Sequence, residues 1–447
     1  MKTNRILGLF VGLLCAASSF AQTMTFTYAD GATATASEMA DGSWLMQLPA
    51  GTDLNAAITG VKVNGAEVTA SAVTPDPTKT FITEGEIETF IYDGKAYSFR
   101  FSAGEYFTAV MFSDPHVDTE DIKNTLTSKV ANIVNMGKEG GKVVNFANAP
   151  KGFVPTADIV FCLGDMDEDK EEDAKGQYYK DATAAFNTAG IPFITLLGNH
   201  DLAPDYWTGA DGGNGLTGGS GGAYYNDLSI AIAKEHLSQA QNNGISEVQI
   251  FKDSDLGSSV TQCEQFAFKY KGVRFYVGHT YWFQKPYKMN SVFGAYASLD
   301  CYYAPDGVID ALDAYVEEHK NEASVWMQHY PFVSEADTKN SRWWLDQNDV
   351  GKCIMPTDAG SSAYYNGGTN VTYDTAEGIA LAEKKREALA TIINKTKNPV
   401  HFSGHVHKYD EQTYKGIKDY SVAQPGNAYV VLCKEGVGVV EVQRVNF

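Results

Sequence analysis

Five short apolar segments of this 447-residue chain each end in residues that can bind a metal ion or transfer a proton. In chain order these are segment 107–113 before Asp114-Pro115-His116, 159–163 before Gly164-Asp165, 193–197 before Gly198-Asn199-His200-Asp201, 325–328 before His329, and 400–403 before Gly404-His405-Val406-His407. In an open α/β sheet, ligands gather at the carboxyl ends of the strands. The recurrence therefore predicts a layered α/β domain in which residues far apart in sequence meet at one rim.

The residue types at these five positions suit a pair of borderline metal ions. Imidazole nitrogens, carboxylate oxygens and one amide oxygen favour manganese, zinc or iron over metals that prefer thiolates. Residues i and i+2 share one side of an extended backbone, so Asp114 and His116 can bind one ion. A turn at Gly404 would let His405 and His407 address two ions. We expect Gly198 and Gly404 to supply the backbone freedom for sharp turns before the ligands.

This ordered set resembles the calcineurin-like metallophosphoesterase family. In that family Asp-x-His, Gly-Asp-x-x-Asp/Glu, Gly-Asn-His-Asp/Glu, a lone His and Gly-His-x-His follow one another along one chain. The resemblance covers residues 107 to about 410, and five motifs in order are far more specific than any one of them. It implies an αββα layered sandwich.

The resemblance also implies a role for each motif residue. A first metal ion would be held by Asp114, His116 and His407, a second by Asn199, His329 and His405, and Asp165 would bridge them. His200 would contact the scissile phosphate and protonate the leaving oxygen, and Asp201 would orient its ring. Glu168 matches an acidic residue outside the direct ligands, and it stands where a purple acid phosphatase carries tyrosine, which disfavours that branch.

The implied activity is hydrolysis of a phosphate ester by a hydroxide that bridges two divalent or trivalent ions. The substrate would be small: a nucleotide, a lipid headgroup or a sugar phosphate ester. Two long segments rich in glycine and aromatic residues, 203–226 and 333–372, favour a phosphodiester over a phosphomonoester. Both ester classes stay open.

Two regions of different pattern divide the chain. Residues 22–103 alternate apolar and polar side chains and contain the turn pairs Asn64-Gly65 and Asp93-Gly94, which predicts a small antiparallel β-sandwich domain. An alternative is that these strands extend the catalytic sheet. Residues 104–447 alternate apolar runs with amphipathic helices, one starting at 119–121 and the others expected at 177–189, 227–241, 307–320 and 375–394, before closing strands at 429–433 and 437–442.

The first 21 residues have the pattern of a secretory signal peptide. Lys2 and Arg5 precede an apolar run at 6–17, and Ser19-Phe20-Ala21 matches a cleavage site after Ala21. We therefore expect a secreted or periplasmic protein with no membrane span. The formal charge of -20 becomes more negative once the two basic residues leave, which argues against binding to a nucleic-acid duplex.

The remaining histidines and cysteines are expected to be structural. His236 and His319 fall on predicted helices and are interpreted as surface or boundary residues, whereas His279 and His401 are interpreted as hydrogen-bonded core residues. Cys162 lies in an apolar run and is expected to be a buried free thiol.

Two other function classes compete with the hydrolase. One is an exported carbohydrate- or surface-binding protein that works through its β-rich first region and carries a vestigial metallophosphoesterase domain. The other is an exported metal-binding protein without hydrolytic activity. An intact ligand set argues against the first, and the retained His200-Asp201 pair argues against the second.

Overall fold

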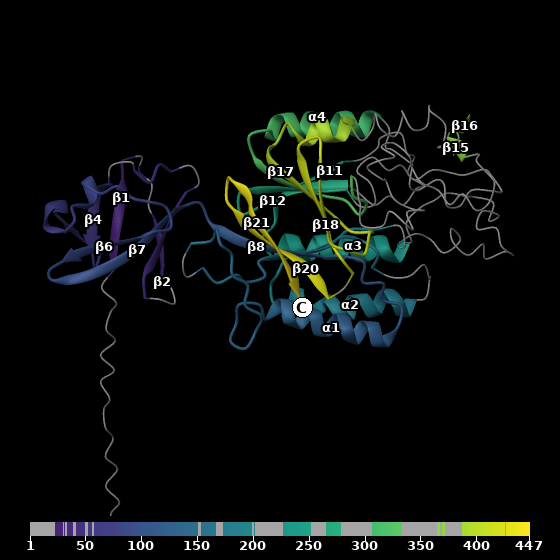
Figure 1. Ribbon diagram of the computed structural model, residues 1–447, viewed down its shortest axis with the longest axis horizontal. Coiled ribbons are helices and arrows are strands. Elements are labelled where there is room, and N and C mark those ends of the chain that lie inside the picture. The colour runs from purple at the N-terminus through teal and green to yellow at the C-terminus, as the bar shows by residue number, and fades with distance from the viewer. Residues whose placement is uncertain are drawn as a thin grey trace, which may run out of the picture. The chain divides into compact units, whose positions relative to one another are not determined.

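The computed structural model (Figure 1) divides into two compact units, with the boundary between Ala103 and Gly104. The structure describes residues 23–29, 31, 34–38, 42–49, 52–55, 58–150, 153–166, 173–198, 201, 227–251, 265–278, 306–332, 364–366, 369–371, 387–424 and 426–447. The segment interpreted as a signal peptide lies outside these ranges. No helix in the described ranges has the length and apolarity needed to cross a bilayer.

The described part of the first unit contains two small sheets and two short 3-10 turns, Ala70–Ala72 and Pro77–Lys79. One sheet has the order β1 (Met24–Tyr28), β4 (Ile58–Val63), β5 (Ala66–Val68); the other has the order β2 (Thr35–Glu38), β3 (Trp44–Leu48), β7 (Lys95–Ala103), β6 (Ile87–Tyr92). Phe26 of β1 lies 5.2 Å from the ring of Phe90 and 5.2 Å from that of Phe99, so side chains of both sheets share one core. That this unit folds as a separate domain stays a prediction.

Both predicted hairpin turns of the first unit are confirmed. Asn64 and Gly65 have φ angles of 53° and 79° between β4 and β5, and Asp93 and Gly94 have 50° and 72° between β6 and β7. These left-handed pairs match the twist of the flanking strands. The expectation of purely antiparallel pairing is wrong, because β3 pairs with β7 in parallel, Trp44 opposite Phe99. The two strands are far apart in sequence, so no short turn dictates their direction.

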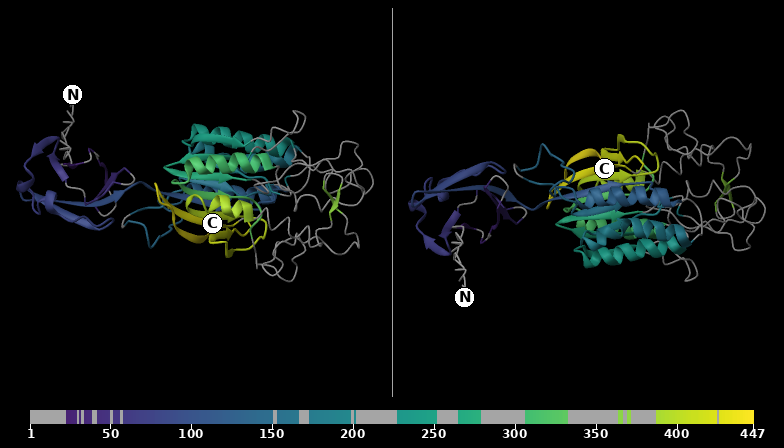
Figure 2. Two further views of the ribbon diagram at one scale, coloured as in Figure 1. Left: turned by 90° about the horizontal axis from the view of Figure 1, so that it is seen from above. Right: turned by 90° about the horizontal axis from the view of Figure 1, so that it is seen from below.

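The second unit is a mixed α/β structure with two large sheets packed face to face, as predicted (Figures 1 and 2). The five-stranded sheet has the order β10 (Phe193–Thr195), β9 (Ile159–Cys162), β8 (Tyr106–Phe112), β20 (Asn427–Lys434), β21 (Gly438–Asn446). The seven-stranded sheet has the order β11 (Ser246–Phe251), β12 (Gln265–Tyr270), β13 (Val273–Val277), β14 (Ala323–Met327), β17 (Lys397–Ser403), β19 (Ile417–Ser421), β18 (Asp410–Tyr414). Between them Phe161 of β9 stacks on Phe275 of β13 at 5.4 Å.

Helices cover the outer faces of both sheets. The five-stranded sheet packs against α1 (Glu120–Val134), α2 (Asp173–Thr188) and α3 (Asp227–Asn242), and the seven-stranded sheet packs against α4 (Asp306–His319) and a helix at 387–393. Helix α1 begins as predicted, because the Thr119 hydroxyl accepts a hydrogen bond from the Ile122 N–H and two acidic residues occupy the first turn. The apolar stripe of α1, with Leu126 and Val130, faces the core.

Helix boundaries differ from the predictions by a few residues. Helix α2 begins at Asp173, four residues earlier than expected, because the polar residues of its first turn carry no apolar periodicity. Of the helix expected at 375–394, residues 375–386 lie outside the described ranges. Within the expected loop 333–372, β15 (Tyr364–Asn366) and β16 (Thr369–Val371) form a two-stranded hairpin.

Candidate metal centre

The predicted ligands follow the carboxyl ends of strands in both large sheets. Strands β8, β9 and β10 are parallel neighbours in one sheet, and β14 and β17 are parallel neighbours in the other. Asp114 and Asp165 follow the first sheet, and His329 and His405 follow the second. The packing of the two sheets brings residues 291 positions apart into hydrogen-bonding contact: the His405 N–H donates to Asp114 Oδ2 at 3.0 Å.

Five of these residues adopt a left-handed backbone conformation: Asp114, His116, Asp165, His405 and His407, with φ between 42° and 68°. Non-glycine residues adopt such angles rarely, and clusters of them are typical of functional sites. The chain segments after β8, β9 and β17 therefore stop extending at their ligands.

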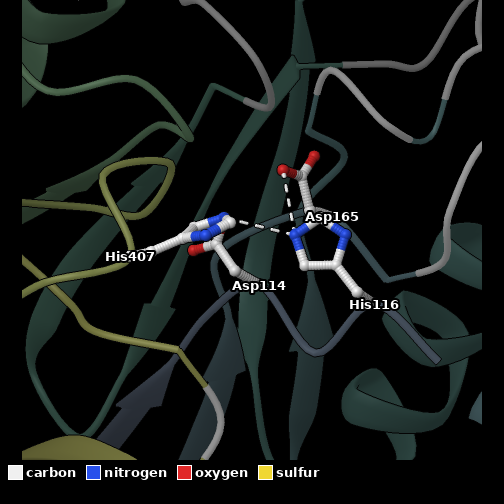
Figure 3. A group of neighbouring side chains, drawn as sticks. All are labelled: Asp114, His116, Asp165 and His407. Atoms are coloured by element: carbon white, nitrogen blue, oxygen red, sulfur yellow. Dashed lines mark hydrogen bonds and ion pairs between the residues drawn. The ribbon is translucent and has the colours of Figure 1, made fainter. Parts of the chain in front are cut away.

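The first ligand group contains Asp114, His116, Asp165 and His407 (Figure 3). The His407 Nε2 lies 3.2 Å from Asp114 Oδ1 and 3.2 Å from the His116 Nε2, which in turn lies 3.8 Å from Asp165 Oδ2. All four ligand atoms fall within 4.8 Å of one another. A single ion between them could contact every one.

The second ligand group contains Asp165, His329 and His405. The His329 Nε2 lies 3.1 Å from Asp165 Oδ2, and the His329 Nδ1–H donates to the Leu163 carbonyl at 2.7 Å. This hydrogen bond keeps a proton on Nδ1, so Nε2 is the ring nitrogen that can bind an ion beside Asp165. Burial lowers the pKa of His329, but the Asp165 and Asp114 carboxylates outweigh it and raise the pKa to about 9.

The chemistry of the donors in both groups suits metal ions. Asp114 and Asp165 are fully buried carboxylates, and their negative charges are close to the imidazoles of both groups. Buried charges need a counter-charge or a metal. Imidazole and carboxylate donors suit manganese, zinc and iron alike, so the residues do not choose between these ions.

Three glycines leave the space in which the ligands approach one another. A Cβ atom at Gly164 would collide with the His329 ring, one at Gly198 with the Asp165 carboxylate, and one at Gly404 with the Ser113 hydroxyl. Only Gly164 has a left-handed φ, 106°. The sharp turn expected at Gly404 is present, because the Val406 N–H donates to the Gly404 carbonyl at 2.8 Å. Gly198 and Gly404 do not adopt left-handed angles themselves, so what each position requires is the absence of a side chain.

Asp201 holds the turn that carries Asp165. Its fully buried carboxylate accepts hydrogen bonds from the backbone N–H groups of Asp165 at 3.0 Å, Met166 at 2.9 Å and Gly198 at 2.7 Å. These bonds join the ends of β9 and β10. The predicted role of Asp201 in orienting His200 stays a prediction, because His200 lies outside the described residues.

The histidines outside the motifs have mixed outcomes. His236 is buried, not a surface or boundary residue, because α3 packs on β10 and its Nδ1 lies 2.8 Å from the Thr195 hydroxyl. Burial lowers the pKa of His236 to about 4. His401 is a hydrogen-bonded core residue as predicted, with Nδ1 2.7 Å from Asp419 Oδ1, while His279 lies outside the described residues.

Cys162 is a buried free thiol, as expected. Burial raises the pKa of this thiol above its usual range, which agrees with a structural role.

No protein-family model and no curated protein sequence matches this chain. The solved structures that match include a Thermus thermophilus protein at 9% identity, covering 76% of this chain and 99% of that one with a TM-score of 0.34. They also include a phosphopantetheinyl hydrolase from Mycobacterium tuberculosis (13% identity, 72% and 92% covered, TM-score 0.31) and a purple acid phosphatase from yellow lupin seeds (12% identity, 95% and 69% covered, TM-score 0.34).

The motif residues of this chain resemble those of the calcineurin-like metallophosphoesterases. Of the positions that match metallophosphoesterase motifs, the structure describes Asp114, His116, Asp165, Asp201, His329, His405 and His407. Asn199, His200 and Glu168 lie outside the described residues.

Sequence reasoning missed two residues that contact the candidate centre or its supporting loops. The Gln424 amide lies 2.8 Å from His407 Nδ1, and Asp419 accepts a hydrogen bond from the Phe332 N–H at 2.7 Å, three residues after His329. Neither residue belongs to a motif or follows an apolar run in a recognisable pattern. Only their tertiary contacts, with His407 and with the Phe332 backbone, identify them.

Proposed function

We propose that this chain is an exported, metal-dependent hydrolase that cleaves a small phosphate ester. The observation that carries the proposal is the position of Asp165, which belongs to both ligand groups: its Oδ2 lies 3.8 Å from His116 Nε2 and 3.1 Å from His329 Nε2. A carboxylate shared by two imidazole groups is the ligand that a pair of close metal ions requires. A single-ion site would not need it.

Each motif residue has a defined task in this proposal. One ion would be bound by Asp114, His116 and His407, the other by Asn199, His329 and His405, with Asp165 between them. When bound, manganese, zinc or iron ions supply an activated water and neutralise the phosphoryl oxygens. Asp201 keeps the Asp165 turn in place through three backbone hydrogen bonds.

His200 would act as the general acid. It follows β10 and immediately precedes Asp201, whose carboxylate lies at the same rim as Asp165. A positioned acid that protonates the leaving oxygen contributes about 10²- to 10⁴-fold to the rate. Loss of His200 is therefore expected to slow hydrolysis strongly while both ions stay bound.

The substrate in this proposal is a nucleotide, a lipid headgroup or a sugar phosphate ester, and not a nucleic-acid duplex. A formal charge of -20 repels a polyanionic duplex over most of the surface, so the ions must supply the local positive charge that a phosphate needs. The glycine- and aromatic-rich segments 203–226 and 333–372 favour a diester with two organic arms. Export by the signal peptide belongs to the same proposal.

The test is hydrolysis of paired nitrophenyl phosphomonoester and phosphodiester substrates by the mature protein. The protein is stripped of metal with a chelator and then reloaded separately with manganese, zinc or iron. Asp165→Ala is expected to lose both bound metal and activity, whereas His200→Ala is expected to lose activity and keep metal. His319→Gln is the matched control, since His319 lies on α4 and pairs only with Glu322 among the described ion pairs.

Metal-restored turnover that both substitutions abolish would support the proposal and reveal the ester class. Strong monoester turnover with no diester turnover would overturn the diester preference alone. A fully metal-loaded protein that turns over neither ester would contradict hydrolysis of such esters and favour a binding role.

A further inference from the structure

Gln424 contacts the most exposed of the described ligand histidines. The side chain of His407 is 38% exposed, compared with 10% for His116 and 0% for His329. Packing therefore restrains the His407 ring less than it restrains the other two. The Gln424 amide nitrogen Nε2 lies 2.8 Å from His407 Nδ1, the ring nitrogen that is not the ligand atom.

The ligand atom of His407 is its Nε2. This atom lies 3.2 Å from Asp114 Oδ1 and 3.2 Å from His116 Nε2, in the middle of the first ligand group. An imidazole that binds a metal through Nε2 keeps its proton on Nδ1, and that proton needs an acceptor. His329 meets this requirement through the Leu163 carbonyl.

Gln424 can meet the same requirement for His407. The oxygen and nitrogen of a glutamine amide occupy nearly the same space, so a half-turn of the amide exchanges a donor for an acceptor. The backbone behind this side chain is anchored, because the Gln424 carbonyl accepts a hydrogen bond from the Asn427 N–H at the start of β20. The side chain therefore extends from a backbone position that this hydrogen bond ties to the start of β20.

We propose that Gln424 is a positioning residue of the metal centre, whose amide oxygen accepts the Nδ1–H of His407 and so directs the His407 Nε2 toward the first ion. This inference rests on the proposed two-ion function. Loss of such an outer hydrogen bond typically weakens metal binding by about 10- to 100-fold.

The test is calorimetric titration of Mn²⁺ into the metal-free full chain. Gln424→Met keeps the side-chain length and removes the acceptor, whereas Gln424→Glu keeps an acceptor and removes the donor. We expect wild type and Gln424→Glu to bind two ions tightly, and Gln424→Met to bind one of the two about 10- to 100-fold more weakly. Gln239→Met is the control, since Gln239 is half-buried on α3, distant in sequence from every ligand, and its amide donates to Glu235 one turn earlier in the same helix.

The outcomes separate this inference from the function on which it rests. Absence of Mn²⁺ binding by the wild-type protein would overturn the proposed function and the role of Gln424 together. Two tight sites in wild type with unchanged affinities in Gln424→Met would overturn the role of Gln424 alone. Equal weakening in Gln424→Met and Gln424→Glu would also overturn it, because an acceptor would then not suffice. Gln424 is exposed, so thermal unfolding of the metal-free variants should match wild type.

Discussion

Replacement of Asp201 by asparagine should loosen the turn that carries Asp165 without changing the size of the side chain. The carboxylate accepts three backbone N–H groups, two at Oδ2 and one at Oδ1. An amide accepts through one oxygen only, so its NH₂ group must face at least one buried N–H. The lost charge-assisted bond costs about 1.5–3 kcal/mol, and the buried donor left without an acceptor adds about 1–3 kcal/mol. We expect a local loss of roughly 4 kcal/mol.

Native-state hydrogen exchange followed by mass spectrometry measures this loss at the turn itself. A 4 kcal/mol reduction in local opening free energy corresponds to roughly a thousandfold faster exchange. We expect that acceleration at the Asp165 and Met166 amides of metal-free Asp201→Asn, and weaker Mn²⁺ binding as its consequence. Asp310→Asn makes the same chemical change on the exposed surface of α4 and should leave these amides unchanged. Exchange in Asp201→Asn as slow as in wild type would refute the role of the carboxylate in this turn.

Three other predictions concern space and protonation. Gly404→Ala should abolish tight Mn²⁺ binding and lower the melting temperature, because the new Cβ would collide with the Ser113 hydroxyl and lie 2.9 Å from Asp114 Oδ2. The calorimetric control is Gly60→Ala, because the nearest atom to a Cβ at that position is 3.5 Å away. Because the pKa of His329 is raised to about 9, its protonated ring stabilises the metal-free fold fully below pH 6.5, and this stabilisation is lost as pH rises through about 9. In urea unfolding with chelator present, the free energy of unfolding of wild type should decline over this window, and that of His329→Gln should not. The lowered pKa of His236 acts in the opposite direction, because its buried ring must take up a proton as pH falls. The free energy of unfolding of wild type should fall by roughly 3 kcal/mol relative to His236→Leu between pH 6.5 and 4. An equal pH dependence of the two proteins would contradict this.

Local features of the fold were predictable because neighbouring residues determine them. Asn64-Gly65 and Asp93-Gly94 adopt the left-handed angles that a two-residue hairpin demands, whatever surrounds them. Thr119 begins α1 by accepting a hydrogen bond only three residues away. The apolar runs before Asp114, Asp165, His329 and His405 form strands because each can be buried on both faces of a sandwiched sheet.

Contacts between distant segments were not predictable from these local patterns. His236 lies on an amphipathic helix, and periodicity places it on a face without showing how deeply that face packs. The three acceptor bonds of Asp201 span up to 36 residues, so its hold on the Asp165 turn follows only from the parallel pairing of β9 and β10. The parallel pairing of β3 with β7 depends in the same way on how the first unit closes.

The order of apolar runs and polar residues along the chain was enough to predict which residues could be ligands, where their strands end and that these ends meet at one rim. Three features follow only from how the segments pack: Asp165 is shared by two groups, Gly198 and Gly404 leave space for their neighbours, and Gln424 contacts His407. The reason is physical: a strand end specifies direction along the chain, whereas the sharing of a carboxylate depends on the distance between two sheets, and the packing of side chains between those sheets sets that distance.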